Sequence, residues 1–161
     1  MASSAIPHAP EPLMPNHKTR LAVLADVAVA LDQAFDDYAK AQGLPLSEMQ
    51  VLYSLYTHES QTQKQIGADW LLPKQTVHTV CKHLHEKGVV QTVPHEGDRR
   101  EKRLALTQAG RAYAETAVQP LLRLEEETEQ AFGSDRLQAL IDEFSALQQL
   151  FSQVAKREHQ E

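Results

Sequence analysis

Apolar residues recur at intervals of three and four positions along five stretches of the chain. This spacing places them on one face of an α-helix and leaves the polar residues between them on the opposite face. The pattern therefore predicts a mainly α-helical protein. The apolar positions are Leu21, Leu24, Ala28, Leu31, Phe35 and Tyr38; Met49, Leu52, Tyr53 and Tyr56; Val77, Val80, Cys81 and Leu84; Ala109, Ala112, Tyr113, Ala117, Leu121 and Leu124; and Leu137, Leu140, Ile141, Phe144, Leu147, Phe151 and Val154.

The pattern changes between the third and the fourth stretch. Gly88 is suited to end a helix, and the β-branched run Val89–Val93 that follows is typical of a strand. A returning strand is expected over Lys102–Leu106, with Gly97 in the turn between the two strands. The predicted fold class is therefore mainly α with a small β-hairpin wing.

Two helices joined by a short turn are expected just before this hairpin. Thr62 is a suitable N-cap for a brief helix that ends near Trp70, and Pro73 fits the first turn of the next helix. Such a helix-turn-helix can place its second helix in the DNA major groove. With the hairpin beside it, the sequence predicts a winged helix-turn-helix domain.

The other amphipathic helices lie outside this DNA-reading unit and need a partner, because an isolated amphipathic helix gains little stability without burying its apolar face. A second copy of the chain is the simplest partner, and a two-fold dimer would match a palindromic DNA site. Thr107 is expected to cap the long helix after the hairpin. We expect a flexible N-terminal tail (1–16), an N-terminal dimerisation helix (17–45), a winged helix-turn-helix DNA-binding domain (46–107) and C-terminal dimerisation helices (108–158).

Composition narrows the classes of protein further. Apolar residues make up 42% of the 161 residues, which is enough to build a core, but no run of eighteen apolar residues predicts a membrane span. The Met1–Pro15 segment has no basic region followed by an apolar run, so it is not expected to be a secretory signal. The single cysteine, Cys81, excludes an internal disulfide and fits a reducing cytoplasm.

The net charge of the chain is −6, but the charge is unevenly distributed. The Lys74–Arg103 window contains seven Lys or Arg and four Asp or Glu, a net charge of +3, so the remainder carries −9. Four of the eight histidines also fall in this window and would add positive charge below neutrality. The asymmetry predicts a local surface that faces phosphate on an otherwise acidic protein.

The same residues resemble the MarR family (multiple-antibiotic-resistance regulator type) of bacterial transcription factors, and the order of expected elements is similar from about Leu21 to Val154. An Asp-Arg-Arg hairpin tip followed by Leu-Thr-x-x-Gly is the most specific part of the likeness. The matching runs are Leu46–Leu52, Gln63–Gly67, Thr76–Val90 and Gly97–Gly110. The last of these runs contains the motif residues Asp98, Arg99, Arg100, Leu106 and Thr107.

The resemblance implies a homodimeric winged-helix DNA binder, usually a repressor that a small ligand releases. It implies that the second helix of the helix-turn-helix enters the major groove and that the wing approaches the minor groove. Residues implied to reach bases or nearby phosphates are Lys74, Gln75, Thr76, His78 and Thr79. Arg99 or Arg100 is the implied wing contact, braced by Asp98, and the implied phosphate contacts are Lys82, Lys102 and Arg103.

The residues also allow two other kinds of site to be considered. Phe35, Tyr53, Tyr56 and Trp70 are candidates to line an effector pocket, although aromatic residues at helical spacing are more often core. His78, Cys81 and His85 share helical spacing with Lys82, but Cys81 falls on the apolar face and His78 on the polar one, so no metal site is expected there. A buried Cys81 is also expected to be inert as a redox sensor. His58 with Glu59, and His17, form the second place to look for a metal.

The sequence thus predicts a dimeric, sequence-specific transcriptional regulator in the cytoplasm, most simply a repressor released by an unidentified small-molecule effector. Its expected partners are a pseudo-palindromic operator in double-stranded DNA and a second copy of itself, with no cofactor and no membrane. A winged-helix module that docks another protein, and a metal-responsive regulator of the same fold, are the alternatives. No paired-carboxylate motif, nucleophile elbow, phosphate-binding loop or zinc-protease motif is present, so we do not expect an enzyme.

Overall fold

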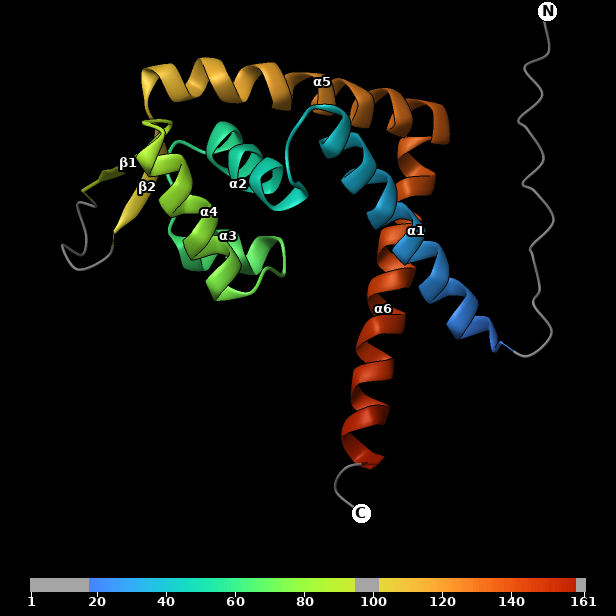
Figure 1. The fold of residues 1–161 in the computed structure, drawn as a ribbon. Coiled ribbons are helices and arrows are strands. Elements are labelled where there is room, and N and C mark those ends of the chain that lie inside the picture. The colour runs from blue at the N-terminus through green and yellow to red at the C-terminus, as the bar shows by residue number, and fades with distance from the viewer. Residues whose placement is uncertain (1–17, 95–101, 159–161) are drawn as a thin grey trace, which may run out of the picture. The chain divides into compact units, whose positions relative to one another are not determined.

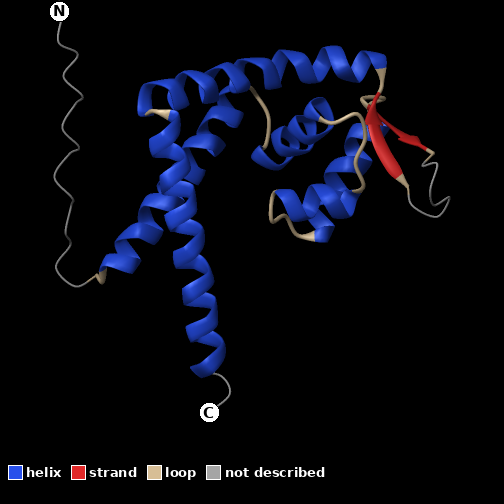
Figure 2. Ribbon diagram, turned by 180° about the vertical axis from the view of Figure 1, so that it is seen from behind, coloured by secondary structure: helices blue, strands red, loops and turns tan. Residues whose placement is uncertain are grey.

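The computed structural model describes residues 18–94 and 102–158, which contain six helices and one two-stranded antiparallel sheet (Figures 1 and 2). This confirms the predicted mainly helical fold with a small hairpin. The chain divides into two compact units, Met1–Leu46 and Ser47–Glu161. Within the described part of the chain, no helix combines the length and the apolar character that a membrane span needs. The elements are α1 (Arg20–Ala41), α2 (Leu46–Thr57), α3 (Gln63–Asp69), α4 (Lys74–Glu86), β1 (Val90–Val93), β2 (Arg103–Leu106), α5 (Gln108–Phe132) and α6 (Ser134–Glu158).

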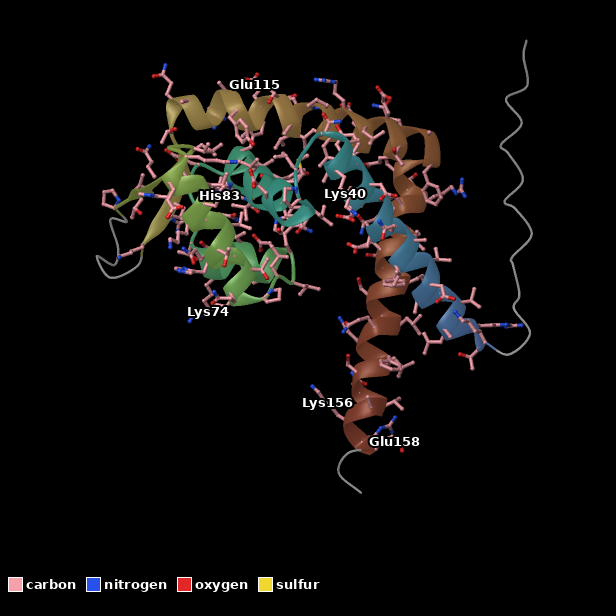
Figure 3. All side chains as sticks on the ribbon, viewed as in Figure 1. Lys40, Lys74, His83, Glu115, Lys156 and Glu158 are labelled. Atoms are coloured by element: carbon pink, nitrogen blue, oxygen red, sulfur yellow. The ribbon has the colours of Figure 1, made fainter. Side chains whose placement is uncertain are left out.

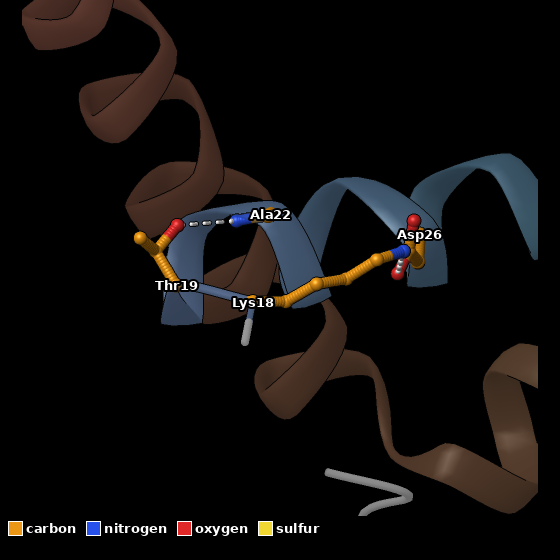
Figure 4. Close-up of polar contacts among 4 residues, drawn as sticks. All are labelled: Lys18, Thr19, Ala22 and Asp26. Atoms are coloured by element: carbon orange, nitrogen blue, oxygen red, sulfur yellow. Dashed lines mark hydrogen bonds and ion pairs between the residues drawn. The ribbon is translucent and has the colours of Figure 1, made fainter. Parts of the chain in front are cut away.

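The first unit consists of α1 and its flanking residues. The hydroxyl of Thr19 caps the helix by accepting a hydrogen bond from the Ala22 amide at 3.2 Å, and Lys18 pairs with Asp26 at 2.5 Å (Figure 4). The apolar side chains along α1 remain largely exposed in the single chain; Leu31, for example, is 62% exposed. The helix ends before Gly43, whose φ of +76° is a left-handed conformation that glycine adopts without strain.

The second unit has its core where α2 packs among α3, α4 and α5, and both ribbon views show α2 between α5 and the α3–α4 pair (Figures 1 and 2). The core is aliphatic, and its largest fully buried side chains come from five different elements. These side chains are Met49, Val51, Leu52, Leu55, Ile66, Val77, Leu84, Val90 and Val118.

Local side-chain caps fix where the helices of this unit begin. Thr62 and Gln65 form a reciprocal capping box at the start of α3, as the Thr62 cap predicted. Thr107 caps α5 by accepting from the Gly110 amide at 2.9 Å, and its own hydroxyl donates to the Gly88 carbonyl at 2.7 Å. The predicted cap is therefore confirmed, and it also ties the start of α5 to the turn that ends α4.

The sheet pairs Val90 with Leu106 and Val93 with Arg103. Gln61, in the link between α2 and α3, forms an additional antiparallel bridge with Leu104, with N···O distances of 3.0 and 2.8 Å. The hairpin is therefore joined through main-chain hydrogen bonds to the residues that lead into the helix-turn-helix.

The buried face of α5 differs from the apolar stripe expected from the sequence. Ala109 and Ala112 are exposed, whereas Ala117 and Leu121 are buried as expected. The face that packs is Gly110, Ala114, Ala117, Val118 and Leu121. Its small residues allow close approach to the preceding turn: a Cβ at Gly110 would lie 2.7 Å from the carbonyl carbon of Val89 and closer still to its oxygen.

Candidate nucleic-acid interface

Helix α4 has one buried and one exposed face, and this division places the candidate DNA-reading residues. Val77, Cys81 and Leu84 are buried, which holds the opposite face outward because side chains three and four positions apart share a side of the helix. Of the predicted contacts on α4, only Thr76 is half-buried. Those that are exposed are Lys74, Gln75, His78, Thr79 and Lys82. Lys74 extends from the first turn of the helix (Figure 3).

Among the described residues, the one side-chain ion pair on the exposed face of α4 is made by Lys82. Lys82 makes an i,i+4 ion pair with Glu86 at 3.8 Å, and both side chains are about two-thirds exposed. Exposed pairs of this kind contribute about 0.3–0.5 kcal/mol. The pair is therefore too weak to keep the Lys82 ammonium from another anion.

The turn between α3 and α4 is tight and carries an unusual residue. The Leu72 amide donates to the Gly67 carbonyl at 2.9 Å, and Pro73 occupies the N-cap position, one residue before the predicted first turn of α4. Leu71 has a φ of +53°, which L-residues rarely adopt, and its side chain is 90% exposed. The turn thus presents an apolar side chain to solvent beside the start of α4.

The two predicted phosphate contacts at the base of the hairpin have different surroundings. Lys102 is exposed, whereas Arg103 is half-buried. The Arg103 guanidinium donates from Nε to Ser60 Oγ at 3.0 Å and from Nη2 to the Ser60 carbonyl at 2.6 Å. The predicted wing contacts Arg99 and Arg100, and the predicted brace Asp98, lie outside the described residues.

Three of the four candidate pocket residues lie in the second unit, where they make specific contacts. The Tyr53 and Trp70 rings meet edge to face, with centroids 5.3 Å apart, and Trp70 Nε1 donates to Ser54 Oγ at 2.6 Å. Tyr56 accepts from Gln119 at 2.8 Å and has the Arg111 guanidinium 5.2 Å from its ring centre. The fourth, Phe35, lies on α1 in the first unit and is 36% exposed.

A carboxylic acid from α5 completes this aromatic cluster. Tyr53 OH donates to Glu125 Oε2 at 3.1 Å. Burial raises the pKa of Tyr53, and the nearby Glu125 charge raises it further. Burial also raises the pKa of Glu125, while the hydrogen bond from Tyr53 opposes that shift. The cluster therefore combines aromatic rings with a carboxyl group that ionises less readily than an exposed one.

A buried acid of α2 that sequence reasoning did not single out contacts α5 and the residue that follows α4. Glu48 is 6% exposed, and its Oε1 lies 3.4 Å from Tyr113 OH and 3.8 Å from Lys87 Nζ. Burial is the largest cause of the raised pKa of Tyr113, followed by the charge of Glu48. The partners of Glu48, Lys87 and Tyr113, are 39 and 65 positions away in the sequence, so no local pattern could have paired Glu48 with either of them.

The residues considered for metal or redox chemistry can be followed where the structure describes them. Across 18–94 and 102–158, no three His, Cys, Asp or Glu side chains come together as a set of metal ligands. Cys81 lies on the buried face of α4, and burial raises the pKa of its thiol to about 11. A thiol in this state is protonated at neutral pH and is a poor nucleophile. His17 lies outside the described residues.

Comparison with known proteins gives a consistent result. A sequence model described as MarR family matches residues 42–101. The chain is similar to a MarR family regulator from Neisseria meningitidis, with 33% identity and a TM-score of 0.79 over 88% of this chain and 99% of that chain. No curated protein matches the chain.

Two further solved structures share the fold at 16% identity. The S. aureus MepR–DNA complex has a TM-score of 0.63 over 84% of this chain and 99% of that chain. NadR in complex with 4-hydroxyphenylacetate has a TM-score of 0.64 over 84% of this chain and 96% of that chain.

Proposed function

Because the chain belongs to the MarR family, whose members are transcription regulators and not enzymes, we propose that it is a dimeric repressor that binds a pseudo-palindromic operator in the cytoplasm and is released by a small-molecule effector. The observation that carries this proposal is the exposed polar face of α4, held outward by Val77, Cys81 and Leu84 and lying beside the hairpin. A protein of the same fold, S. aureus MepR, has been solved with DNA.

The chemistry of this face suits sequence reading. The Gln75 amide can make two hydrogen bonds to adenine, and Thr79 offers a hydroxyl and a methyl group to the major groove. Lys74 and Lys82 would meet phosphates, which add affinity without adding specificity. The proposed reading residues are therefore separable by experiment into those that choose a sequence and those that only strengthen binding.

The test is a gel-shift or anisotropy titration with the DNA upstream of the chain's own gene, at several salt concentrations. Gln75→Ala should weaken binding to that DNA about tenfold or more and reduce its preference over competitor DNA. Lys74→Ala should weaken binding to both DNAs alike. Lys156→Ala, which removes the same charge from the last turn of α6, is the control that should leave binding unchanged. Absence of binding to any upstream fragment at low salt would contradict the proposal.

Dimerisation is supported by the state of the C-terminal helix. All 25 residues of α6 are described, and none is buried in the single chain. Its exposed apolar side chains include Leu140, Ile141, Phe144, Phe151 and Val154. A continuous apolar stripe of this length is stable only when something covers it, and a second copy of the same helix does so with two-fold symmetry.

Sedimentation should therefore give twice the chain mass of 18.0 kDa. Phe144→Glu should shift the protein towards the monomer, because it places a charge in the covered stripe. The exposed neighbour Glu143 provides the control, since Glu143→Gln changes charge on the same helix without entering the stripe. A monomeric wild-type protein at micromolar concentration would exclude the dimer.

An effector site is supported by the Tyr53–Trp70 pair with Glu125 and Ser54 around it. Aromatic rings with a few polar groups are the usual lining of small-molecule sites. NadR, which shares the fold, has been solved with 4-hydroxyphenylacetate. Phe35 remains a candidate from the sequence.

Trp70 is the only tryptophan, so its fluorescence reports on this cluster directly. Aromatic compounds, starting with 4-hydroxyphenylacetate, would be titrated against Trp70 fluorescence and against DNA binding in parallel. An effector should change both signals over the same concentration range, and Tyr53→Phe should alter that range. A compound that changes the fluorescence but never the DNA affinity would argue against an effector site here.

A further inference from the structure

Arg103 in β2 has a fixed position that its neighbour Lys102 does not share. Its guanidinium donates two hydrogen bonds to Ser60, one to the hydroxyl at 3.0 Å and one to the main-chain carbonyl at 2.6 Å. The side chain is half-buried, although arginine is normally exposed. Two different nitrogens of one planar group make these bonds, a geometry that the single nitrogen of lysine cannot reproduce.

These bonds are continuous with main-chain contacts between the same two segments. The next residue in β2, Leu104, exchanges both main-chain hydrogen bonds with Gln61, the residue after Ser60. Two consecutive residues of β2 are thus held against two consecutive residues of the link between α2 and α3. We call this group, Ser60, Gln61, Arg103 and Leu104, the wing clamp.

The wing clamp also reaches the helix-turn-helix. Gln61 Nε2 donates to Asp69 Oδ2 at 3.0 Å, which joins the link to the last residue of α3. Thr62, directly after the clamp, caps the start of α3. The base of the hairpin is therefore hydrogen-bonded through Gln61 to the last residue of α3, and the residue that caps the start of α3 follows Gln61 directly in the chain.

We propose that Arg103 is a positioning residue of the DNA-reading surface, which fixes the hairpin relative to the helix-turn-helix through Ser60 and does not itself neutralise a phosphate. The inference rests on the proposed DNA-binding function. It assigns Arg103 a role different from that of a phosphate contact, for which its charge alone would matter. Lys102, exposed and one position earlier, keeps the role of phosphate contact.

The two roles give opposite results for a change that keeps the charge. Arg103→Lys leaves the phosphate attraction in place but removes the paired hydrogen bonds to Ser60. A positioning role predicts that Arg103→Lys binds the upstream DNA about tenfold more weakly than wild type. A phosphate contact predicts nearly unchanged affinity.

Salt dependence separates the roles a second time. Removing the charge that neutralises one phosphate makes the negative slope of log K against log salt shallower by about 0.9. We expect this reduction for the matched neighbour Lys102→Gln. We expect a wild-type slope for Arg103→Lys in spite of its lower affinity.

Ser60→Ala tests the clamp from its other side, because it removes the hydroxyl that Arg103 contacts and leaves the carbonyl. Ser60→Ala should weaken DNA binding less than Arg103→Lys does. In the double variant, Ser60→Ala should reduce the DNA affinity by a smaller factor than it does in the wild-type background. Amide hydrogen exchange at Gln61 and Leu104 should quicken in both variants, while circular dichroism shows them folded.

Wild-type affinity in Arg103→Lys, or additive effects in the double variant, would overturn the positioning role. A wild-type protein that binds no DNA would overturn the proposed function itself and the role with it. The exchange rates at Gln61 and Leu104 distinguish these cases, because they report on the clamp without DNA.

Discussion

Gly110→Ala offers the sharpest test of the packing, because two physical effects of opposite sign act at this position. Gly110 lies in the first turn of α5, where alanine is the better helix former by up to about 1 kcal/mol. A Cβ there, however, would lie 2.7 Å from the Val89 carbonyl carbon and inside contact distance of its oxygen. Both obstructing atoms belong to the main chain, so no side chain can rotate to make room.

The steric effect is expected to win. Overpacking costs about 1–3 kcal/mol. Moving α5 away would also weaken two hydrogen bonds of Thr107, from its amide to the Val89 carbonyl at 3.0 Å and from its hydroxyl to the Gly88 carbonyl at 2.7 Å. Each contributes about 1 kcal/mol. Against a helix-propensity gain of about 1 kcal/mol, the net loss of unfolding free energy is about 2–4 kcal/mol.

Thermal and urea unfolding, followed by circular dichroism at matched protein concentration, would measure this loss. We expect the melting temperature to fall by about 10 °C. Gly67→Ala is the matched control, since a Cβ there meets Leu72 O at 3.4 Å and Val77 Cγ2 at 3.5 Å, which is ordinary contact. The control should be neutral or more stable than wild type by up to about 1 kcal/mol. If Gly110→Ala were as stable as Gly67→Ala, the close approach of α5 to Val89 would be refuted.

Three further predictions concern single side chains. Leu71→Asn should raise the unfolding free energy by about 1 kcal/mol in urea titrations, because asparagine tolerates the left-handed backbone and the leucine side chain is 90% exposed. A lower unfolding free energy would show that the left-handed backbone at Leu71 is not strained. Burial raises the pKa of the Cys81 thiol from 9.0 to about 11. Cys81 should therefore react with a disulfide reagent at pH 8 about a hundredfold more slowly in the folded protein than in urea, and equal rates would disprove its burial. Burial raises the pKa of Glu125 above 4.5, so its contribution to stability is present at low pH and is lost as pH rises through the raised pKa. Glu125→Gln, which can still accept from Tyr53, should therefore gain stability relative to wild type at pH 7 but not at pH 4, and a parallel pH profile would contradict this.

The features that sequence reasoning predicted correctly depend on neighbours along the chain. The caps at Thr62 and Thr107 involve an amide three residues later, and the buried face of α4 follows from one apolar stripe. The hairpin strands were predicted within one residue at their ends, because the β-branched residues of the first strand and the turn residue Gly97 mark them locally. Short-range chemistry was sufficient for these elements.

The features that it missed depend on contacts between distant residues. The hydrogen-bond partner of Arg103, Ser60, is 43 positions away along the chain, so no local pattern could have predicted these bonds. The apolar stripe expected on α5 included Ala109 and Ala112, but the buried face is set by where Gly110 allows the helix to approach Val89. Three-dimensional proximity decided both cases, and a single sequence does not encode it in any local pattern.

The exposed apolar stripe of α6 has a consequence for how proteins of this architecture diverge. Since none of its 25 residues is buried by its own chain, substitutions along the stripe leave the core around α2 intact. In the dimer proposed above, complementary changes on α6 alone would, after a gene duplication, stop the two products from pairing with each other. Each could then keep the same DNA-reading helix, and a cell could hold several such regulators without mixed assemblies.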